Sequence, residues 1–253
     1  HTLKLPLDRL DPFLDAKLLP EEVLQVLSVI ERRTVERIPA AYITNEAWLG
    51  TYAFYVDERV LVPRSFIAEL IPNFFSPWVT NPYEVENVLE LSTGSGCLAI
   101  MMADVYQNAV VDAVDISKDA LAVAERNIRD YKLEGRVNPI ESDLYENVPF
   151  KKYDLIVTNP PYVNADSMAK LPPEYLREPQ IALHGGEDGM DLVRKIVAGA
   201  AERLTPEGIL VVEIGNEAEY AEAAFGHLGL TWLTTSAGDE AVFLLTAEQL
   251  QNA

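Results

Sequence analysis

The sequence predicts an α/β protein with a doubly wound parallel sheet, preceded by a small N-terminal helical segment and a linking hairpin. From residue 87 onward, short β-branched and aliphatic runs alternate with amphipathic helical patterns. Glycine, proline or acidic residues follow several of these runs. A chain of 253 residues that is 49% hydrophobic can also bury a substantial core. In such a sheet, ligands bind at the carboxyl ends of the strands.

The N-terminal part predicts a helix and no sheet. Pro20 opens the run "PEEVLQVLSVIERR", which has acidic residues in its first turn and Arg32 and Arg33 in its last. Val23, Val26, Leu27 and Ile30 share one face of this helix. We assign residues 1–45 to a helical substrate-recognition segment. Because the chain begins with His1 and not Met, we expect this segment to be truncated.

Residues 46–80 predict a hairpin and a connecting helix. Aromatic and β-branched residues between Ala47 and Val62 indicate two strands joined around "VDER", and "VPRSFIAELIPNFF" indicates a helix. The stretch "SPWVTNPYE", at residues 76–84, contains the Pro, Ser and Asn residues typical of turns and predicts a linker. The remaining residues, 81–253, form the predicted catalytic domain.

Strands and helices alternate through this last domain. The seven predicted strands are 87–91, 109–115, 137–141, 154–158, 209–214, 230–234 and 241–245. The predicted helices are near 97–107, 118–132, 189–203 and 217–226.

Composition excludes several classes of function. Forty acidic residues against 20 basic ones give a net charge of −20, which would repel a phosphate backbone but attract a basic protein. Cys97 is the only cysteine, so no internal disulfide is possible and a cytoplasmic location is expected. The three histidines are far apart, so we expect no metal. The chain contains no run of about 18 apolar residues, so no membrane span is predicted.

The stretch "VLELSTGSGCLAI", residues 88–100, predicts a strand, a glycine turn and a helix. Gly94 and Gly96 let backbone N–H groups approach a ligand closely. Asp115 ends the next strand, where its carboxylate can accept both hydroxyls of a ribose. Together, the glycine turn and Asp115 indicate a nucleoside cofactor. Its identity stays open, since Gly94-x-Gly96-x-x-Ala99 also fits a dinucleotide pattern and a tight loop needs no ligand at all.

Two further acidic positions belong to this predicted site. Glu90, just before the glycine turn, would be unfavourable near a pyrophosphate but useful near an ammonium or sulfonium cation; it could also be a solvated strand end. Asp143 follows the third strand and could accept from an exocyclic adenine amine, with Leu144 covering the ring. Taken alone, Ser-Asp at this position is slightly more typical of a helix cap or turn.

The tetrapeptide "NPPY", residues 159–162, follows the fourth predicted strand. It offers the Asn159 side-chain carbonyl and the Pro160 main-chain carbonyl, and neither proline has an N–H to compete. Such a set of acceptors can hold a planar –NH2 group by both hydrogens and fix its nitrogen against an electrophilic methyl group. Tyr162 can pack on the flat face of that group. An Asn-Pro turn beside a buried Tyr is the alternative.

Together these motifs resemble amino-methyltransferases that use S-adenosylmethionine (SAM). Their glycine motif matches Glu90 to Gly96, and their (Asp/Asn)-Pro-Pro-(Tyr/Phe) motif matches Asn159 to Tyr162. That motif is common to adenine-N6 methylases of nucleic acid and to enzymes that methylate a glutamine amide in proteins. The resemblance implies a Rossmann-like fold and SAM as the cofactor.

A longer resemblance, from about Arg37 to Leu250, is to the HemK-like protein-glutamine methyltransferases. "ERIPAAYITNEAW" and "FYVDERVLVPRS" are similar to the branch that acts on large-subunit ribosomal protein L-three; the release-factor branch has Pro-Arg-Pro-Glu-Thr where this chain has Pro63-Arg64-Ser65. Phe66 departs from the proline expected there. "EPQIALHGGEDGMDLVRKI", residues 178–196, is similar to the family's loop beside the substrate cleft.

The resemblance implies a role for each matching residue. SAM is expected to contact Glu90, Ser92, Thr93, Gly94, Ser95, Gly96, Asp115, Asp143, Leu144 and Asn159. The substrate glutamine is expected to contact Asn159, Pro160, Pro161 and Tyr162, of which Asn159, Pro160 and Tyr162 would act in catalysis. Trp48, Tyr52 and Phe54 could line recognition surface, but hairpin core is the favoured interpretation for each.

The expected reaction is direct transfer of a methyl group to glutamine N5 in ribosomal protein L-three, without a covalent enzyme intermediate. Four alternatives remain: a release-factor methyltransferase, an adenine-N6 nucleic-acid methylase, a SAM-sensing ribosome assembly factor and a nicotinamide dehydrogenase. The net charge disfavours nucleic acid, and the intact "NPPY" disfavours a purely sensing role.

Overall fold

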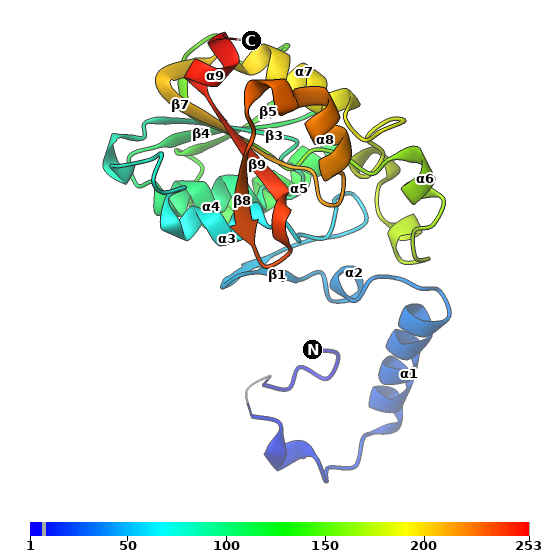
Figure 1. Cartoon of the computed structure of the whole chain (residues 1–253). Helices are drawn as coiled ribbons and strands as arrows, with labels where there is room; N and C mark the ends of the chain where they lie inside the picture. The colour runs from blue at the N-terminus through cyan, green and yellow to red at the C-terminus, as the bar shows by residue number, and fades with distance from the viewer. Residues whose placement is uncertain (7–8, 253) are drawn as a thin grey trace.

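The computed structural model describes residues 1–6 and 9–252, so residues 7–8 and 253 of the first and last predicted segments lie outside the described residues. A seven-stranded sheet forms the centre of the catalytic part, in the order β5-β4-β3-β6-β7-β9-β8 (Figure 1). Its strands are β3 (Asn87–Leu91), β4 (Val110–Asp115), β5 (Val137–Glu141), β6 (Tyr153–Thr158), β7 (Leu204–Glu213), β8 (Thr231–Thr235) and β9 (Gly238–Thr246). The predicted α/β class and doubly wound sheet are confirmed.

The parallel pairing that the alternation predicts does not extend to β9. Strands β5, β4, β3, β6 and β7 pair in parallel, whereas β9 is antiparallel to both β7 and β8. The cause is the length of the β8–β9 connection: Thr235 pairs with Gly238, so only Ser236 and Ala237 lie between them. A parallel connection needs a crossover of about a dozen residues or more, and a turn this short can only form a hairpin.

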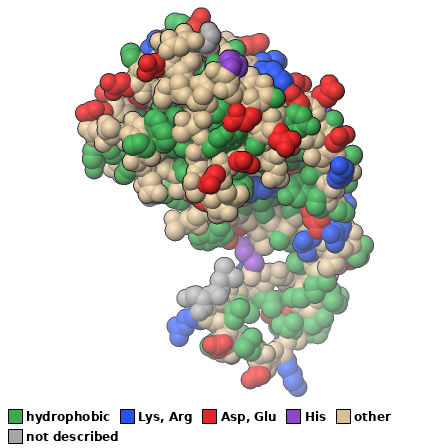
Figure 2. All heavy atoms as spheres, in the orientation of Figure 1, with side chains coloured by type: hydrophobic (Ala, Val, Ile, Leu, Met, Phe, Trp, Pro, Cys, Tyr) green, Lys and Arg blue, Asp and Glu red, His purple; other side chains and the backbone are tan. Residues whose placement is uncertain are grey.

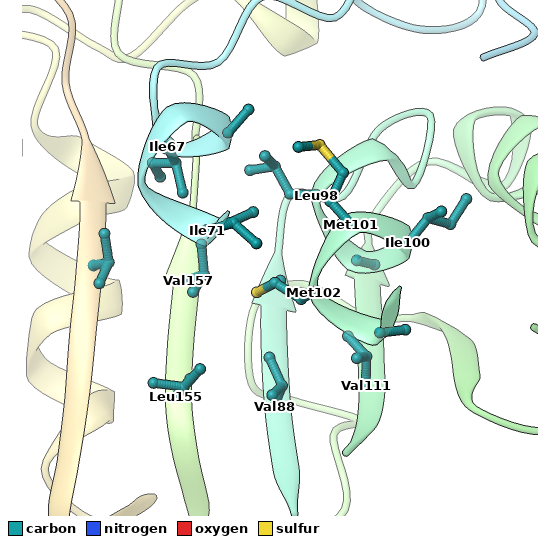
Figure 3. Close-up of a cluster of buried hydrophobic side chains, with 14 of the residues drawn as sticks. Ile67, Ile71, Val88, Leu98, Ile100, Met101, Met102, Val111, Leu155 and Val157 are labelled. Atoms are coloured by element: carbon teal, nitrogen blue, oxygen red, sulfur yellow. The ribbon is translucent and has the colours of Figure 1, made fainter. Parts of the chain in front are cut away.

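Helices cover both faces of the sheet. On one face, α3 (Ile67–Leu70) and α4 (Cys97–Val105) pack in a core with Val88, Leu155 and Val157 (Figure 3). On the other face, the second core joins α7 (Asp191–Ala200), α8 (Ala218–Phe225) and α9 (Ala247–Gln251) to the sheet. Val88 and Leu89 are consecutive in β3 yet belong to opposite cores, as expected for a strand that is buried on both faces.

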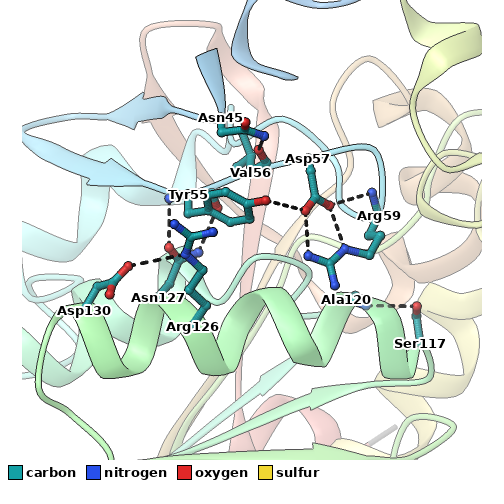
Figure 4. Close-up of polar contacts among 10 residues, drawn as sticks. All are labelled: Asn45, Tyr55, Val56, Asp57, Arg59, Ser117, Ala120, Arg126, Asn127 and Asp130. Atoms are coloured by element: carbon teal, nitrogen blue, oxygen red, sulfur yellow. Dashed lines mark hydrogen bonds and ion pairs between the residues drawn. The ribbon is translucent and has the colours of Figure 1, made fainter. Parts of the chain in front are cut away.

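The hairpin lies earlier in the chain than predicted. Its strands are β1 (Ala47–Leu49) and β2 (Tyr52–Phe54), which turn at Gly50 with φ +60°. The "VDER" stretch is a separate turn, in which Asp57 accepts from the Arg59 backbone N–H and from its guanidinium (Figure 4). An Asp that bonds two residues ahead stabilises such a turn without strands on either side.

Aromatic contacts fix this hairpin to the end of α5 (Lys118–Asp130). Phe54 is 1% exposed, and its ring and that of Tyr52 lie within 6.3 Å of each other. Both rings also contact Tyr131. Phe54 is therefore hairpin core, as expected, but the same expectation is wrong for Trp48, which is exposed.

The predicted helix after the hairpin is shorter than expected. Only α3 is α-helical, and a 3₁₀ turn, Ile71–Asn73, follows it. Residues 61–65 do not join the helix: Leu61 and Arg64 line cavities at the sheet edge. Pro63 and Pro72 bracket the helical segment, because each lacks the N–H that a longer helix would use.

The N-terminal segment contains α1 (Pro20–Thr34), as predicted, and a short helix α2 (Ala40–Thr44) that was not. No residue of α1 is buried, and Leu24, Leu27 and Ile30 are exposed. Figure 2 shows hydrophobic side chains gathered over this lower part of the molecule. The division of the chain at residues 45 and 80 stays a prediction.

Two remaining predictions concern membranes and the single cysteine. In the part of the chain that the structure describes, no helix has the length and apolar content to cross a bilayer. The one cysteine, Cys97, is buried at the start of α4.

Candidate active site

The turn after β3 is the first part of the site. Ser92, Gly94 and Gly96 all have positive φ values, of 60°, 55° and 79°. Thr93 donates its backbone N–H to the Val114 carbonyl at 2.9 Å, which ties the turn to β4. A Cβ at Gly96 would lie 3.1 Å from the Ala124 side chain, so glycine there lets α5 pack closely against the turn.

Asp115, the last residue of β4, is fixed by two backbone donors. Its Oδ2 accepts from Gly94 N–H at 2.8 Å, and its Oδ1 accepts from Ser117 N–H at 2.9 Å. Burial raises the pKa of Asp115 above its ordinary value, and the two N–H bonds oppose that rise. The carboxylate therefore has a defined position at the edge of the sheet.

A cavity of about 230 Å³ lies over this edge. Six predicted cofactor residues line it: Ser92, Gly94, Asp115, Asp143, Leu144 and Asn159. They follow four adjacent strands, β3, β4, β5 and β6, whose parallel direction brings their carboxyl ends together. The predicted substrate residue Pro161 lines this cavity as well.

The other predicted cofactor residues do not line the cavity. Thr93 and Ser95 are buried residues of the turn, Gly96 ends the turn as the N-cap of α4, and Glu90 precedes the turn in β3. Glu90 is 2% exposed and accepts from the Thr93 hydroxyl and, at 3.0 Å, from Ala99 N–H. Burial raises the pKa of Glu90 to about 8. Glu90 therefore holds the turn to the start of α4 through Thr93 and Ala99.

A second cavity, of about 720 Å³, adjoins the first. It is lined by Asn159, Pro160 and Tyr162, the three residues predicted to act in catalysis. Leu61, Asn159 and Ala182 line both cavities. Asn159 therefore stands at the boundary between a cavity lined by the cofactor motifs and a cavity that opens beside "NPPY".

Three glycines allow close packing around "NPPY". A Cβ at Gly185 would meet the Tyr162 backbone at 2.6 Å, one at Gly189 would overlap the Tyr162 carbonyl, and one at Gly215 would meet the Tyr162 ring at 2.6 Å. Val163 and Gly185 also bond through Gly185 N–H to the Val163 carbonyl at 2.9 Å. The "HGGEDG" part of residues 178–196 thus packs directly against the tetrapeptide.

A buried carboxylate, that of Glu178, fixes the segment that follows the "VDER" turn. Glu178 accepts from Arg64 Nη1 at 2.8 Å and from Val62 N–H at 3.0 Å. The Arg64 guanidinium also lies 4.6 Å from the centre of the Tyr175 ring. Arg64 and Tyr175 both line the second cavity, so this ion pair shapes its wall.

Sequence reasoning missed several lining residues. Arg59, Ile116 and Lys195 line the first cavity; Arg64, Glu217 and Glu240 are the charged residues of the second. Ile116 directly follows Asp115 and could have been found from its position. The others come from segments far away in sequence. Among the residues that the structure describes, no group of three or more metal-binding side chains is present.

Comparisons with known proteins agree with this geometry. A family model described as the methyltransferase small domain matches residues 73–183. A methyltransferase from Pyrococcus furiosus has a TM-score of 0.56 at 17% identity, covering 88% of this chain and 98% of that one. The hMettl16 catalytic domain, solved with a MAT2A 3'UTR hairpin, has a TM-score of 0.60 at 11% identity, covering 90% and 82%. These two structures show the fold alone, and they confirm the predicted Rossmann-like fold.

Two curated relatives are much more similar in sequence. The ribosomal protein uL3 glutamine methyltransferase of Burkholderia pseudomallei is 58% identical over 99% of this chain and 84% of its own length. The enzyme of the same name from Neisseria gonorrhoeae is also 58% identical, over 99% and 83%. The resemblance read from "NPPY", "VPRS" and the glycine turn is confirmed, and the chain belongs to the family of ribosomal protein uL3 glutamine methyltransferases.

Proposed function

We propose that this protein transfers a methyl group from SAM to the side-chain amide nitrogen of a glutamine in ribosomal protein uL3, the large-subunit protein L-three. The observation that carries the proposal is the position of Asn159, which lines both cavities. One cavity would hold the methyl donor and the other the glutamine side chain.

The first cavity fits SAM in its donor set. Asp115 offers a fixed carboxylate to the ribose hydroxyls, and Asp143 and Leu144 offer an acceptor and an apolar surface to the adenine. The backbone of Ser92 to Gly96 would contact the rest of the SAM molecule, and the buried carboxyl group of Glu90 lies next to this turn. When bound there, SAM supplies an electrophilic methyl group on a sulfonium.

Catalysis by the protein is mainly a matter of position. An amide nitrogen is a weak nucleophile, because its lone pair is delocalised into the carbonyl. The Asn159 side-chain oxygen and the Pro160 carbonyl would accept the two amide hydrogens, and neither proline offers a competing N–H. Tyr162 would hold the plane of the amide. As the nitrogen takes the methyl group, the methyl–sulfur bond would break and leave a neutral thioether; both acceptors would stabilise the positive charge that develops on the nitrogen, which would then lose one proton to water.

The charge of the molecule suits this substrate. A net charge of −20 favours encounter with a basic ribosomal protein and disfavours nucleic acid. Two acidic side chains, those of Glu217 and Glu240, also line the second cavity. We also infer a cytoplasmic location, where ribosomal proteins are made, and a recognition role for residues 1–45.

The test offers labelled SAM with uL3, a release factor and RNA side by side, followed by peptide mapping. We expect label on one glutamine of uL3 with a mass gain of one methyl group. Label on the release factor or on adenine would mean that the substrate is that molecule and not uL3. Tight uL3 binding without label in a single turnover would make the protein a SAM-sensing assembly factor.

A further inference from the structure

Glu213, the last residue of β7, has a buried carboxylate directly under the second cavity. The residue is 1% exposed and lines neither cavity. Its neighbours in the chain, Gly215 to Ala218, line the second cavity, so Glu213 lies below the wall that they form.

The two carboxylate oxygens of Glu213 contact two other walls of that cavity. Oε2 accepts from the Ser65 hydroxyl at 2.5 Å, from Phe66 N–H at 2.9 Å and from Ile67 N–H at 3.4 Å. Oε1 lies 3.5 Å from the Tyr162 hydroxyl, which donates to it. Phe66 and Tyr162 both line the second cavity.

We propose that Glu213 is a positioning residue for methyl transfer: it sets the angle of the Tyr162 ring relative to the segment Ser65–Ile67, and so sets the width of the cavity for the glutamine amide. The inference rests on the proposed function, since the glutamine is assigned to this cavity there. Glu213 does not touch the substrate and acts through Tyr162.

A purely stabilising role fits Glu213 poorly. Burial, opposed by the donors Ser65, Phe66, Ile67 and Tyr162, raises the pKa of Glu213 to about 6. A carboxylate with a raised pKa is less favourable in the folded protein than in the unfolded chain, so at neutral pH its charge lowers stability. A group kept at the expense of stability is more typical of a functional position than of a structural one.

Glu213→Gln separates the two roles. Its amide oxygen can still accept from Ser65 and Phe66, but its –NH2 can only donate to the Tyr162 hydroxyl, so the hydrogen bond that Tyr162 donates in the wild type is reversed. We expect kcat for uL3 methylation to fall by about 10- to 100-fold, because a small misplacement of a positioning group has an effect of that size. The dissociation constant for SAM should not change, and the melting temperature at pH 7.5 should be equal or higher.

Two further variants complete the experiment. Tyr162→Phe removes the hydroxyl and keeps the ring, and the double variant Glu213→Gln/Tyr162→Phe should be no slower than the slower single variant. Asp112→Asn is the matched control: Asp112 is also a buried carboxylate of the sheet, held by Lys151 and Tyr153, and should lose stability but keep kcat.

The outcomes are distinct. An unchanged kcat in Glu213→Gln, a clear fall in its melting temperature, or single-variant factors that multiply in the double variant would each overturn the inference. If the wild-type protein methylates no glutamine, the proposed function fails and the inference fails with it; an active wild type beside an equally active Glu213→Gln overturns the inference alone.

Discussion

Gly215 lies directly against the ring of Tyr162: a Cβ at residue 215 would come within 2.6 Å of Tyr162 Cε2. Gly215 also has φ +55°, a conformation that other residues rarely adopt. The position of the tyrosine ring therefore depends on the absence of a side chain at residue 215, just after β7.

Gly215→Ala should accordingly displace the Tyr162 ring. We expect kcat to fall by about tenfold or more, with SAM affinity kept, because the ring belongs to the second cavity alone. Kinetics and calorimetry on the same sample provide the check. Gly135→Ala is the control, since a Cβ there would meet nothing within 4 Å. Equal turnover in Gly215→Ala would mean that the ring position is unimportant.

Asp115→Asn should weaken SAM binding by about 10- to 100-fold, the range expected when a charged hydrogen-bond acceptor is lost. The asparagine would also direct an –NH2 group at one of the two backbone donors, Gly94 or Ser117. Calorimetric titration with SAM measures the effect. Asp112→Asn on the same strand should leave the SAM affinity unchanged, and comparable losses in both variants would argue against a specific role for Asp115.

Arg64→Ala should destabilise the protein by about 2 kcal/mol, because it leaves the Glu178 carboxylate buried without its cation. The loss is smaller than for a fully buried ion pair, because the Arg64 side chain is 35% exposed and water screens its charge. Arg33→Ala is the comparison, since it breaks a more exposed pair with Glu174 and should change stability by less than about 1 kcal/mol. Urea denaturation gives both values. The account of the ion pair would be wrong if the two losses were alike.

Glu90→Gln should raise stability at neutral pH. The pKa of Glu90 is raised to about 8, while an unfolded Glu ionises near 4.5. Between these values the folded state binds more protons than the unfolded state, so stability falls as pH rises from 4.5 to 8. By pH 7 the loss is of the order of 3 kcal/mol, and glutamine removes it.

Melting temperatures across that pH window test the prediction. The wild-type curve should fall more steeply than that of Glu90→Gln. Glu86→Gln, at an exposed position in the chain just before β3, should follow the wild type. Parallel curves for Glu90→Gln and the wild type would show that the buried carboxyl group does not titrate there.

Much of the site could be predicted because it depends on neighbours in sequence. Asp115 and Asn159 each come at or just after the end of a strand, and parallel strands place those ends at one edge. The glycine turn and "NPPY" are likewise continuous stretches. The same reasoning could not place Glu90 below the turn and out of the cavity, because burial depends on how α4 and α5 pack.

The residues that were missed depend on long-range contacts. Ser65 and Glu213 are 148 residues apart in sequence, and Arg64 and Glu178 are 114 apart. No local pattern brings such pairs together. The β8–β9 hairpin was misread for a different reason: residues 236–240 contain small and acidic residues that favour a loop, yet β9 begins at Gly238 because pairing with β8 overrides that preference.

The most direct test of the account is the turnover of Asn159→Ala with uL3, measured together with its dissociation constant for SAM. Because Asn159 would accept one of the amide hydrogens, we expect turnover to fall by about 100-fold or more while SAM affinity changes far less. A variant that methylates uL3 at the wild-type rate would contradict the assignment of the amide nitrogen to the boundary between the two cavities.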